Sequence, residues 1–594
     1  MRPARRSIGK HRIGALVVAT MVAIALSASG CESGTDGDDA APPPTIGAPS
    51  APGSGSAPGG ARDDTNLLAG RDWGHFAGAS VAGEVVRIRP LGRAIVKQDG
   101  SGGQANPPVN LRGPHLEVAG DFEVAATLRD TAAAPAYLQL YGEVPVVYDE
   151  WRQERRSVRL GVVGGRLEVA LWDGRKAEPV RTETMGAKLP AEVALSMRRG
   201  GGRLEFRAGE AVLGSVADHD VFGAGRIWFG ADAGVGGPGW ELAALRVRAL
   251  PGGRATIVDA PALGLPHTAP DALRTVAAGR KRPVDPGVAV AAGPLYTDQD
   301  YRTLIAGQFS MLTPENDMKP QFVHPRPDVY DFADADSMID FARANEMKVH
   351  GHTLVFGEAL PRWMREVSRG ERERVMTEHI ATVAGHFRGR VAEWDVVNEP
   401  LSIEDADYAA GKPGLRQHIW QEGMGEQYLD KAFRAARAAD PDAALFLNEF
   451  GIEENGPRWD ALLALVKRLK ARGVPIDGVG FQTHIHDRGD HLDQAVFGAH
   501  LKALADLGIR SRVSEIDVHG EDREAQAEQF AVAMRTCAAA PTCGSFGTWG
   551  ATDHYGSTAE HDSYPLSVGD ELMWDTKQEP KPAVEAVRAA LRSD

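Results

Sequence analysis

Two periodicities divide the chain. Between about residues 70 and 250, apolar and polar residues alternate in short runs, for example at 167–171, 204–207 and 226–229. Glycine-rich turns such as 200–202 separate these runs. Alternation of period two is typical of strands with one buried face. Many short strands joined by such turns predict an antiparallel β-sandwich.

After residue 268, apolar runs alternate with amphipathic stretches. The apolar runs are strand candidates, and they lie at 288–292, 309–313, 348–356, 393–397, 444–447, 478–483, 512–516 and 545–551. Among the stretches with helical spacing are 371–387, 427–439, 459–472 and 524–537. Strands that alternate with helices over this length predict an α/β domain of the (β/α)8, or TIM barrel, type. In that fold the carboxyl ends of the strands carry the active site.

The N-terminal residues predict export rather than a folded domain. A basic segment precedes an apolar run at 13–28, which ends in small residues directly before Cys31. This layout resembles the cleavage site of a bacterial lipoprotein, with a lipid on Cys31 that anchors the protein to a membrane. An uncleaved signal anchor is the alternative. Which membrane or leaflet would hold the anchor stays open.

Composition supplies the remaining boundaries. Residues 31–65 are mostly Gly, Ser, Pro, Ala and Asp, which predicts a disordered tether. The predicted organisation is an export signal at 1–30, the tether at 31–65, the β-sandwich at 66–250, a linker at 251–267 and the barrel at 268–594. The net charge of −15 argues against a nucleic-acid partner and is compatible with a neutral polysaccharide. We expect a monomer.

Two apolar stretches of the barrel end in glutamates. The stretch 394–400 delivers Glu399, and the stretch 513–518 delivers Glu515. Two carboxyl groups that converge from two strand ends suit the cleavage of a glycosidic bond, which needs one acid and one base or nucleophile. The alternative is that each glutamate is only a salt-bridge partner.

Six motifs then stand in order along the barrel. They are TPENDMK at 313–319, GHTLV at 351–355, WDVVNEP at 394–400, GFQTH at 480–484, EID at 515–517 and WGATD at 549–553. Together they resemble glycoside hydrolase family 10, the retaining endo-β-1,4-xylanases, over about residues 268–594. The resemblance implies a hydrolase that acts on a polysaccharide without a metal or an organic cofactor.

The resemblance also implies a role for each motif residue. Glu399 is expected to be the general acid/base, and Glu515 the nucleophile that forms a covalent glycosyl-enzyme. Asn398 would hold the 2-hydroxyl of the sugar being cleaved. His484 would hydrogen-bond the nucleophile, with Asp517 behind it, and a charged His484 would help to keep Glu515 anionic.

Further positions are expected to bind substrate through hydroxyl contacts or stacking. They are Glu315, Asn316, Lys319, His352, Gln482 and Trp549. Lys319 as a solvated lysine and His352 as a structural histidine are the alternatives. Cys537 and Cys543 resemble a disulfide loop common in the family, and export to an oxidising compartment makes that disulfide plausible.

Several positions depart from the family pattern. Phe356-Gly357-Glu358-Ala359 stand where Trp-His, then Ser or Asn, then Gln are usual, and Ser557 stands where a tryptophan is usual. These departures leave the sugar in doubt more than the reaction, and Glu358 could bind a different decoration.

The β-sandwich allows two interpretations. Its segment 121–242 resembles the lectin- and laminin-G-like jelly rolls in pattern, which implies carbohydrate binding. The alternative is a structural or spacer domain. Trp151, Trp172, Trp228 and Trp240 could stack on sugars, although a tryptophan in a sandwich is more often part of the core.

The sequence therefore predicts a retaining endo-acting hydrolase of β-1,4 linkages in xylan. A related hydrolase of another β-glycan or of a plant glycoside is one alternative. A surface glycan-binding protein without turnover is the other, although intact Glu399 and Glu515 argue against it.

Overall fold

The structure is a computed structural model. It describes residues 66–75, 79–82, 84–90, 94–96, 102–104, 109–143, 156–174, 179–233, 237–267, 269–402, 414–485, 491–520, 522–556 and 570–593. The predicted export signal, Cys31 and the tether lie outside these residues. Within them, no helix has the length and apolar character needed to cross a membrane.

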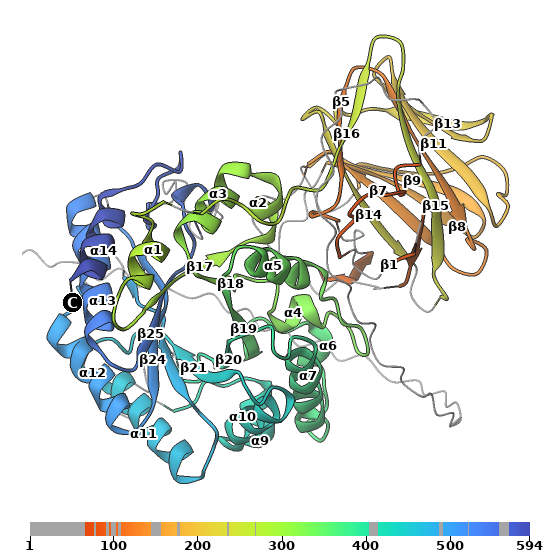
Figure 1. The fold of residues 1–594 in the computed structure, drawn as a ribbon. Coiled ribbons are helices and arrows are strands. Elements are labelled where there is room, and N and C mark those ends of the chain that lie inside the picture. The colour runs from red at the N-terminus through yellow and green to blue at the C-terminus, as the bar shows by residue number, and fades with distance from the viewer. Residues whose placement is uncertain are drawn as a thin grey trace, which may run out of the picture. The chain divides into compact units, whose positions relative to one another are not determined.

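The N-terminal strands form two seven-stranded antiparallel sheets (Figure 1). In spatial order, the first sheet contains β1 (Ala79–Ala82), β2 (Val85–Ile88), β15 (Trp240–Ala249), β6 (Phe122–Arg129), β11 (Val193–Gly200), β12 (Arg203–Ala208) and β13 (Ala211–Ala217). The second contains β10 (Arg181–Met185), β9 (Arg166–Trp172), β8 (Ser157–Val163), β7 (Ala136–Tyr141), β14 (Arg226–Ala233), β5 (His115–Ala119) and β16 (Arg254–Val258). A separate hairpin pairs β3 (Ala94–Val96) with β4 (Gly102–Gln104). The predicted antiparallel sheets are confirmed.

The two sheets share one hydrophobic core. On β12, for example, Leu204 and Phe206 are buried in it, while Arg203, the first residue of the strand, is exposed. Trp240 also belongs to this core. The linker prediction is corrected at one point: β16 lies within 251–267 and pairs with β5, so the sheets end at Val258 rather than at 250.

The C-terminal strands form a closed parallel barrel. Its eight strands are β17 (Asp285–Val290), β18 (Met311–Pro314), β19 (Lys348–Phe356), β20 (Glu393–Asn398), β21 (Ala444–Glu449), β22 (Gly478–Phe481), β24 (Arg510–Val518) and β25 (Cys543–Thr548). Closure comes from pairing of β22 with β24 and of β25 with β17, and the short β23 (His484–Ile485) lies beside β24. All eight correspond to predicted strands, and the barrel prediction is confirmed.

Helices surround the barrel strands (Figure 1). They are α1 (Leu273–Ala278), α2 (Ala292–Thr297), α3 (Gln299–Gln308), α4 (Pro320–Val323), α5 (Ala333–Ala344), α6 (Arg362–Arg365), α7 (Arg372–His386), α9 (Ile419–Met424), α10 (Gln427–Ala439), α11 (Pro457–Ala471), α12 (Gln494–Asp506), α13 (Arg523–Ala539) and α14 (Pro582–Arg592), with a 3-10 turn η1 (Asp553–Tyr555). Asp298, Asp493 and Asp522 cap α3, α12 and α13, and each carboxylate accepts two backbone N–H groups.

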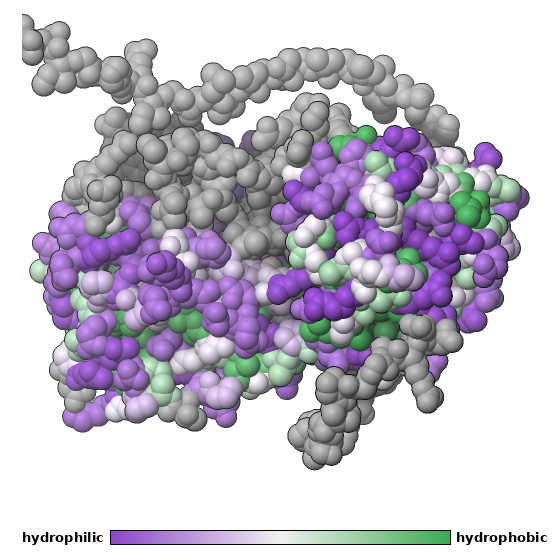
Figure 2. All heavy atoms as spheres, turned by 90° about the horizontal axis from the view of Figure 1, so that it is seen from above, coloured by the Kyte–Doolittle hydropathy of each residue, from purple (hydrophilic) through white to green (hydrophobic). Residues whose placement is uncertain are grey.

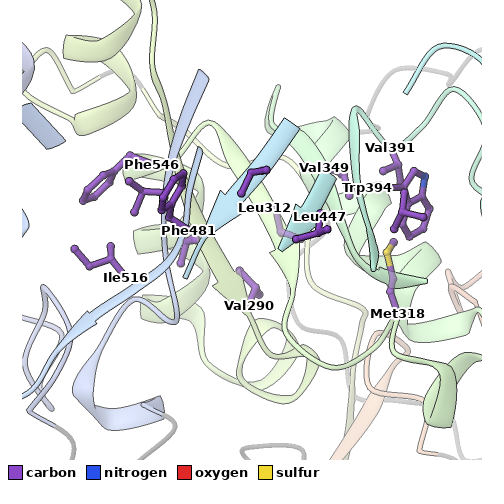
Figure 3. Packing of buried hydrophobic residues seen from close by; sticks show 14 of the residues in the cluster. Val290, Leu312, Met318, Val349, Val391, Trp394, Leu447, Phe481, Ile516 and Phe546 are labelled. Atoms are coloured by element: carbon purple, nitrogen blue, oxygen red, sulfur yellow. The ribbon is translucent and has the colours of Figure 1, made fainter. Parts of the chain in front are cut away.

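Apolar side chains of the barrel strands and helices form one large buried cluster. Val290, Leu312, Val349 and Leu447 come from four different strands and belong to it (Figure 3). Parallel strands that are covered on both faces need such near-continuous apolar runs. These runs could therefore be recognised in the sequence. The coloured part of the surface in Figure 2 is mainly hydrophilic, with apolar residues between the polar ones.

One disulfide joins the end of α13 to the start of β25. Cys537 and Cys543 are bonded, with a Cα–Cα distance of 5.2 Å. Both side chains are buried in the barrel core.

A glycine on β19 fixes the spacing between two strands that carry site residues. A Cβ at Gly351 would overlap the ring of Trp394 on β20. We expect Gly351→Ala to destabilise the barrel by about 3 kcal/mol through overpacking, measured as a lower thermal midpoint with loss of activity. Gly385→Ala on α7, where a Cβ meets nothing within 4 Å, is the control. It should be neutral or stabilising by about 0.5–1 kcal/mol. Equal midpoints for the two variants would contradict this packing constraint.

Candidate active site

Two glutamates meet at the carboxyl ends of the barrel strands. Glu399 follows β20 directly, and its backbone is in the left-handed region with φ 51°. Glu515 lies within β24 and is 5% exposed. The side chain of Glu399 is 17% exposed. The strained backbone turns the Glu399 side chain out of the strand and into the site.

Asn448, at the end of β21, connects the two glutamates. Its Nδ2 donates to Asn398 Oδ1 at 2.9 Å and also to Glu515 Oε1. Asn398 Nδ2 in turn donates to Glu399 Oε1 at 3.3 Å, and Gln482 Nε2 donates to the same oxygen at 3.3 Å. The predicted residues Asn398 and Gln482 therefore lie between the two carboxyl groups.

His484 and Asp517 lie beside Glu515, which is the arrangement that the family resemblance implied. His484 Nδ1 is 2.7 Å from Asp517 Oδ2, and its Nε2 is 3.6 Å from Glu515 Oε2. Burial alone would lower the pKa of His484, but the carboxylates of Asp517 and Glu515 raise it well above its ordinary value. His484 is therefore a cation over the neutral pH range.

The positive charge of His484 acts on Glu515. Burial alone would raise the pKa of Glu515. The hydrogen bond with His484 and the charges of His352 and His484 outweigh burial and lower that pKa. Glu515 is thereby held as a carboxylate, the form a nucleophile needs.

His352 lies closer to Glu515 than its expected sugar-binding role requires. It is 2% exposed, and its Nδ1 is 2.9 Å from Asp395 Oδ2. His350 Nε2 approaches the same oxygen at 2.8 Å. Burial raises the pKa of Asp395, and His352 opposes that shift. His352, Asp395 and Glu515 bring ligand atoms within 4.8 Å of one another. Each of these groups already has hydrogen-bonding partners, which favours a polar network over a metal site.

The other predicted binding residues form one group after β18 and β25. Lys319 Nζ donates to Asn316 Oδ1 at 2.8 Å and lies 5.5 Å from the ring centre of Trp549. Asn316 Nδ2 donates to Glu315 Oε1 at 3.3 Å, and burial raises the pKa of Glu315 against the effect of Lys319. Trp549 also meets His352 edge-on, with ring centroids 5.3 Å apart. This group presents donors, acceptors and an aromatic face, the chemistry that sugar hydroxyls and rings require.

Glu399 has a charged partner that sequence reasoning missed. Arg416 Nη1 forms an ion pair with Glu399 Oε2, and its Nη2 is 2.9 Å from Glu358 Oε1. Below them, Glu449 is fully buried and accepts the Leu401 N–H at 3.0 Å. Burial raises the pKa of Glu449 to about 7.

Asp395 was absent from the predicted site, and Asn448 was expected at a strand end there without an assigned role. Asn448 had a usable signal, because it ends a predicted strand as a polar residue. Asp395 lies inside an apolar run, and only the barrel places it against two histidines. Asp553 braces the last loop: Lys581 Nζ is 2.9 Å from its Oδ2, and Leu572 N donates to its Oδ1 at 2.8 Å.

A parallel barrel with two glutamates at the carboxyl ends of β20 and β24 has the architecture of a glycoside hydrolase. Residues 272–590 match the sequence profile of Glycosyl hydrolase family 10. The chain is 31% identical to endo-1,4-beta-xylanase 5 of Pyricularia oryzae over 325 residues, which is 51% of this chain and 77% of the relative. The chain belongs to glycosyl hydrolase family 10.

Other relatives agree with this assignment. The chain is 39% identical to endo-1,4-beta-xylanase B of Thermotoga neapolitana over 221 residues, 37% of this chain and 61% of that protein. It thus spans about three-fifths of the length of the first relatives it matches. Xylanase 10B of Thermotoga petrophila RKU-1, solved in complex with xylobiose, shares 35% identity. The match covers 55% of this chain and 98% of that structure, with a TM-score of 0.50.

The charge on His484 gives a testable pH dependence. In Asp517→Asn, His484 loses its counter-charge, so its pKa falls and the pKa of Glu515 rises. Because Glu515 must be ionised, the acidic limb of the kcat/KM profile should move to higher pH. Asp442→Asn, an exposed aspartate before the amino end of β21, should leave the limb in place. An unmoved limb in Asp517→Asn would show that His484 does not set the charge of Glu515.

Proposed function

We propose that the protein is a retaining, endo-acting glycoside hydrolase that cleaves β-1,4 linkages in xylan. The observation that carries the proposal is the opposed setting of two carboxyl groups in one site. Glu515 is buried against His484, whereas Glu399 is more exposed and carries its own ion pair with Arg416. Membership of the family and relatives named as xylanases support the choice of substrate.

In the proposed reaction, Glu515 attacks the anomeric carbon and forms a covalent glycosyl-enzyme. Glu399 protonates the leaving oxygen and then takes a proton from the water that hydrolyses the intermediate. Asn398, held by Asn448, is in place to bind the 2-hydroxyl, a contact that strengthens in the transition state. Two inversions at one carbon retain its configuration.

Substitution of each carboxyl group separates the two roles. Glu515→Ala should lose more than about 10⁴-fold in kcat on every substrate, because no nucleophile remains. Glu399→Ala should lose about 10²–10⁴-fold in kcat/KM on xylan but much less in kcat/KM on an aryl β-xyloside with an acidic leaving group, because that group leaves without protonation. NMR of the first-formed product should give the β-anomer.

A panel of xylans, mixed β-glucans, cellulose and aryl β-xylosides, assayed with the full chain, tests the substrate. Wild-type activity in Glu515→Ala would contradict the nucleophile assignment. Activity confined to another β-glycan would change the substrate assignment but not the proposed reaction. The absence of turnover on the whole panel would support a glycan-binding protein.

Another glycan is the second candidate, and the loop after β19 favours it. Phe356, Gly357 and Ala359 replace groups that the family pattern places near the bound sugars, and Ser557 lies outside the described residues. A site that lacks hydroxyl-binding groups binds its transition state less tightly, which changes the preferred sugar before it changes the reaction.

For the sandwich, the structure supports packing over sugar stacking by the tryptophans it describes. Trp172, Trp228 and Trp240 are 3%, 6% and 1% exposed. A buried ring cannot serve as an open stacking platform. Trp151 lies outside the described residues. We therefore propose a structural or spacer role for the sandwich, and a jelly-roll, lectin-like function would need another surface.

We propose that the protein is an exported bacterial lipoprotein, held to a membrane by a lipid on Cys31. The basic segment, the apolar run and the small residues before Cys31 support this proposal. In the native host, Cys31→Ser should move the protein from the membrane fraction to the soluble exported fraction. Tyr555→Phe, a substitution in the barrel, serves as the control and should stay with the membrane. Unchanged fractionation of Cys31→Ser would refute lipidation at this residue.

A further inference from the structure

One arginine is shared between two carboxylates at the rim of the site. Arg416 uses Nη1 for Glu399 and Nη2 for Glu358, with the second distance at 2.9 Å. The side chain of Arg416 is 12% exposed and that of Glu358 is 60% exposed. Glu358 is thus the most exposed of three charged groups in contact, Glu358, Arg416 and Glu399, the last being the proposed acid/base.

The backbone holds Arg416 in this place. Arg416 N donates to Pro400 O at 2.8 Å, and Ser402 N donates to Gly414 O at 2.9 Å. Leu401 and Leu415 form an antiparallel bridge between these bonds. The segment that carries Arg416 is therefore paired with the residues directly after Glu399. This pairing places the start of the Arg416 side chain beside Glu399.

Glycine at position 357 lets Glu358 reach Arg416. A Cβ at Gly357 would lie 2.8 Å from His418 Cδ2 and 3.0 Å from His418 Cβ. A larger residue would push the loop after β19 away from the segment 416–418. Arg365 donates to the carbonyl of Glu358 and anchors the loop on its other side. The replacement of the family's Trp-His pair thus coincides with a close approach that only glycine allows.

We propose that Glu358 is a positioning residue for the acid/base, acting through Arg416. It holds one edge of the guanidinium and takes part of its charge, so that Arg416 orients Glu399 without fully favouring its ionised form. A general acid must keep its proton until the leaving oxygen departs, and a lone arginine at contact distance would oppose this. The inference rests on the proposed role of Glu399.

The other charged or titratable groups around these residues come from five places in the barrel. They are Glu449 on β21, Arg458 on α11, His418 before α9, Tyr428 on α10 and Arg365 on α6, which donates to the carbonyl of Glu358. Burial, with the charge of Arg416, lowers the pKa of His418 to about 4, so it is neutral at working pH. Burial raises the pKa of Tyr428, which is also neutral. Burial raises the pKa of Glu449 to about 7, and Glu449 pairs with Arg458 in the same way in the chain that carries either exposed glutamate.

The test compares two exposed glutamates in the full chain. Glu358→Gln removes one charge and keeps the side-chain shape. The control, Glu366→Gln, removes an equally exposed charge (61%) that pairs with Arg362 on α6 instead. With an aryl β-xylobioside that has a poor leaving group, Glu358→Gln should move the basic limb of kcat/KM to lower pH and cost severalfold above the optimum. The shift should shrink with a good leaving group, and thermal midpoints should match because exposed ion pairs add little stability.

A second comparison tests the route through Arg416. In an Arg416→Gln background, Glu358→Gln should cause no further shift of the limb. A shift that persists there, or equal profiles for Glu358→Gln and Glu366→Gln, would overturn the proposal. Failure of the proposed function is read separately, because Glu399→Ala would then keep its activity on substrates with poor leaving groups.

Discussion

The arrangement of the two glutamates depends on the contacts of one buried amide. Asn448 is fully buried, and its backbone carbonyl accepts the Glu399 N–H at 2.8 Å. Its side chain bonds Asn398 and Glu515, and its Oδ1 accepts from Ser514 Oγ at 2.7 Å. A single residue on β21 thus contacts both β20 and β24, the two strands that position the glutamates. Because a buried amide is costly to leave unpaired, these bonds form together or not at all.

Charge is distributed unevenly around this amide. On the side of Glu515, His484 pairs with Glu515 and Asp517, whose side chains are 7% and 4% exposed. On the side of Glu399, Arg416 pairs with Glu399 and also with Glu358, whose side chain is 60% exposed. In the proposed reaction, Glu515 stays a carboxylate while Glu399 gives up and regains a proton. The exposed charge of Glu358 lies on the side of the carboxyl group that would change protonation.

Features of the fold and of the site could be predicted from the sequence where they depend on residues close together along the chain. The strand 348–356 was predicted with its observed bounds, since its apolar run reports burial on both faces. Period two placed Glu515 and Asp517 on one face of β24, and both face His484 in the structure. Gln482 and His484 reach the site differently, because β22 ends at Phe481 and Thr483 between them is left-handed with φ 61°. No local pattern records that kink.

The residues that the sequence did not reveal depend on contacts between loops that are far apart along the chain. Arg416 acts on Glu399 because the segments at 400–402 and 414–416 pair, and long-range pairing of loops has no periodicity to read. Glu358 was visible as a departure from the family pattern, yet its partner was not, and a sugar seemed the natural ligand. The strand ends thus supply the two carboxyl groups of the proposed reaction, and the loops supply residues that adjust their surroundings. Where a loop position changes, as at Gly357 and Glu358, a second loop position such as His418 must fit the altered space. The effect of such a change can therefore be understood only from both positions together.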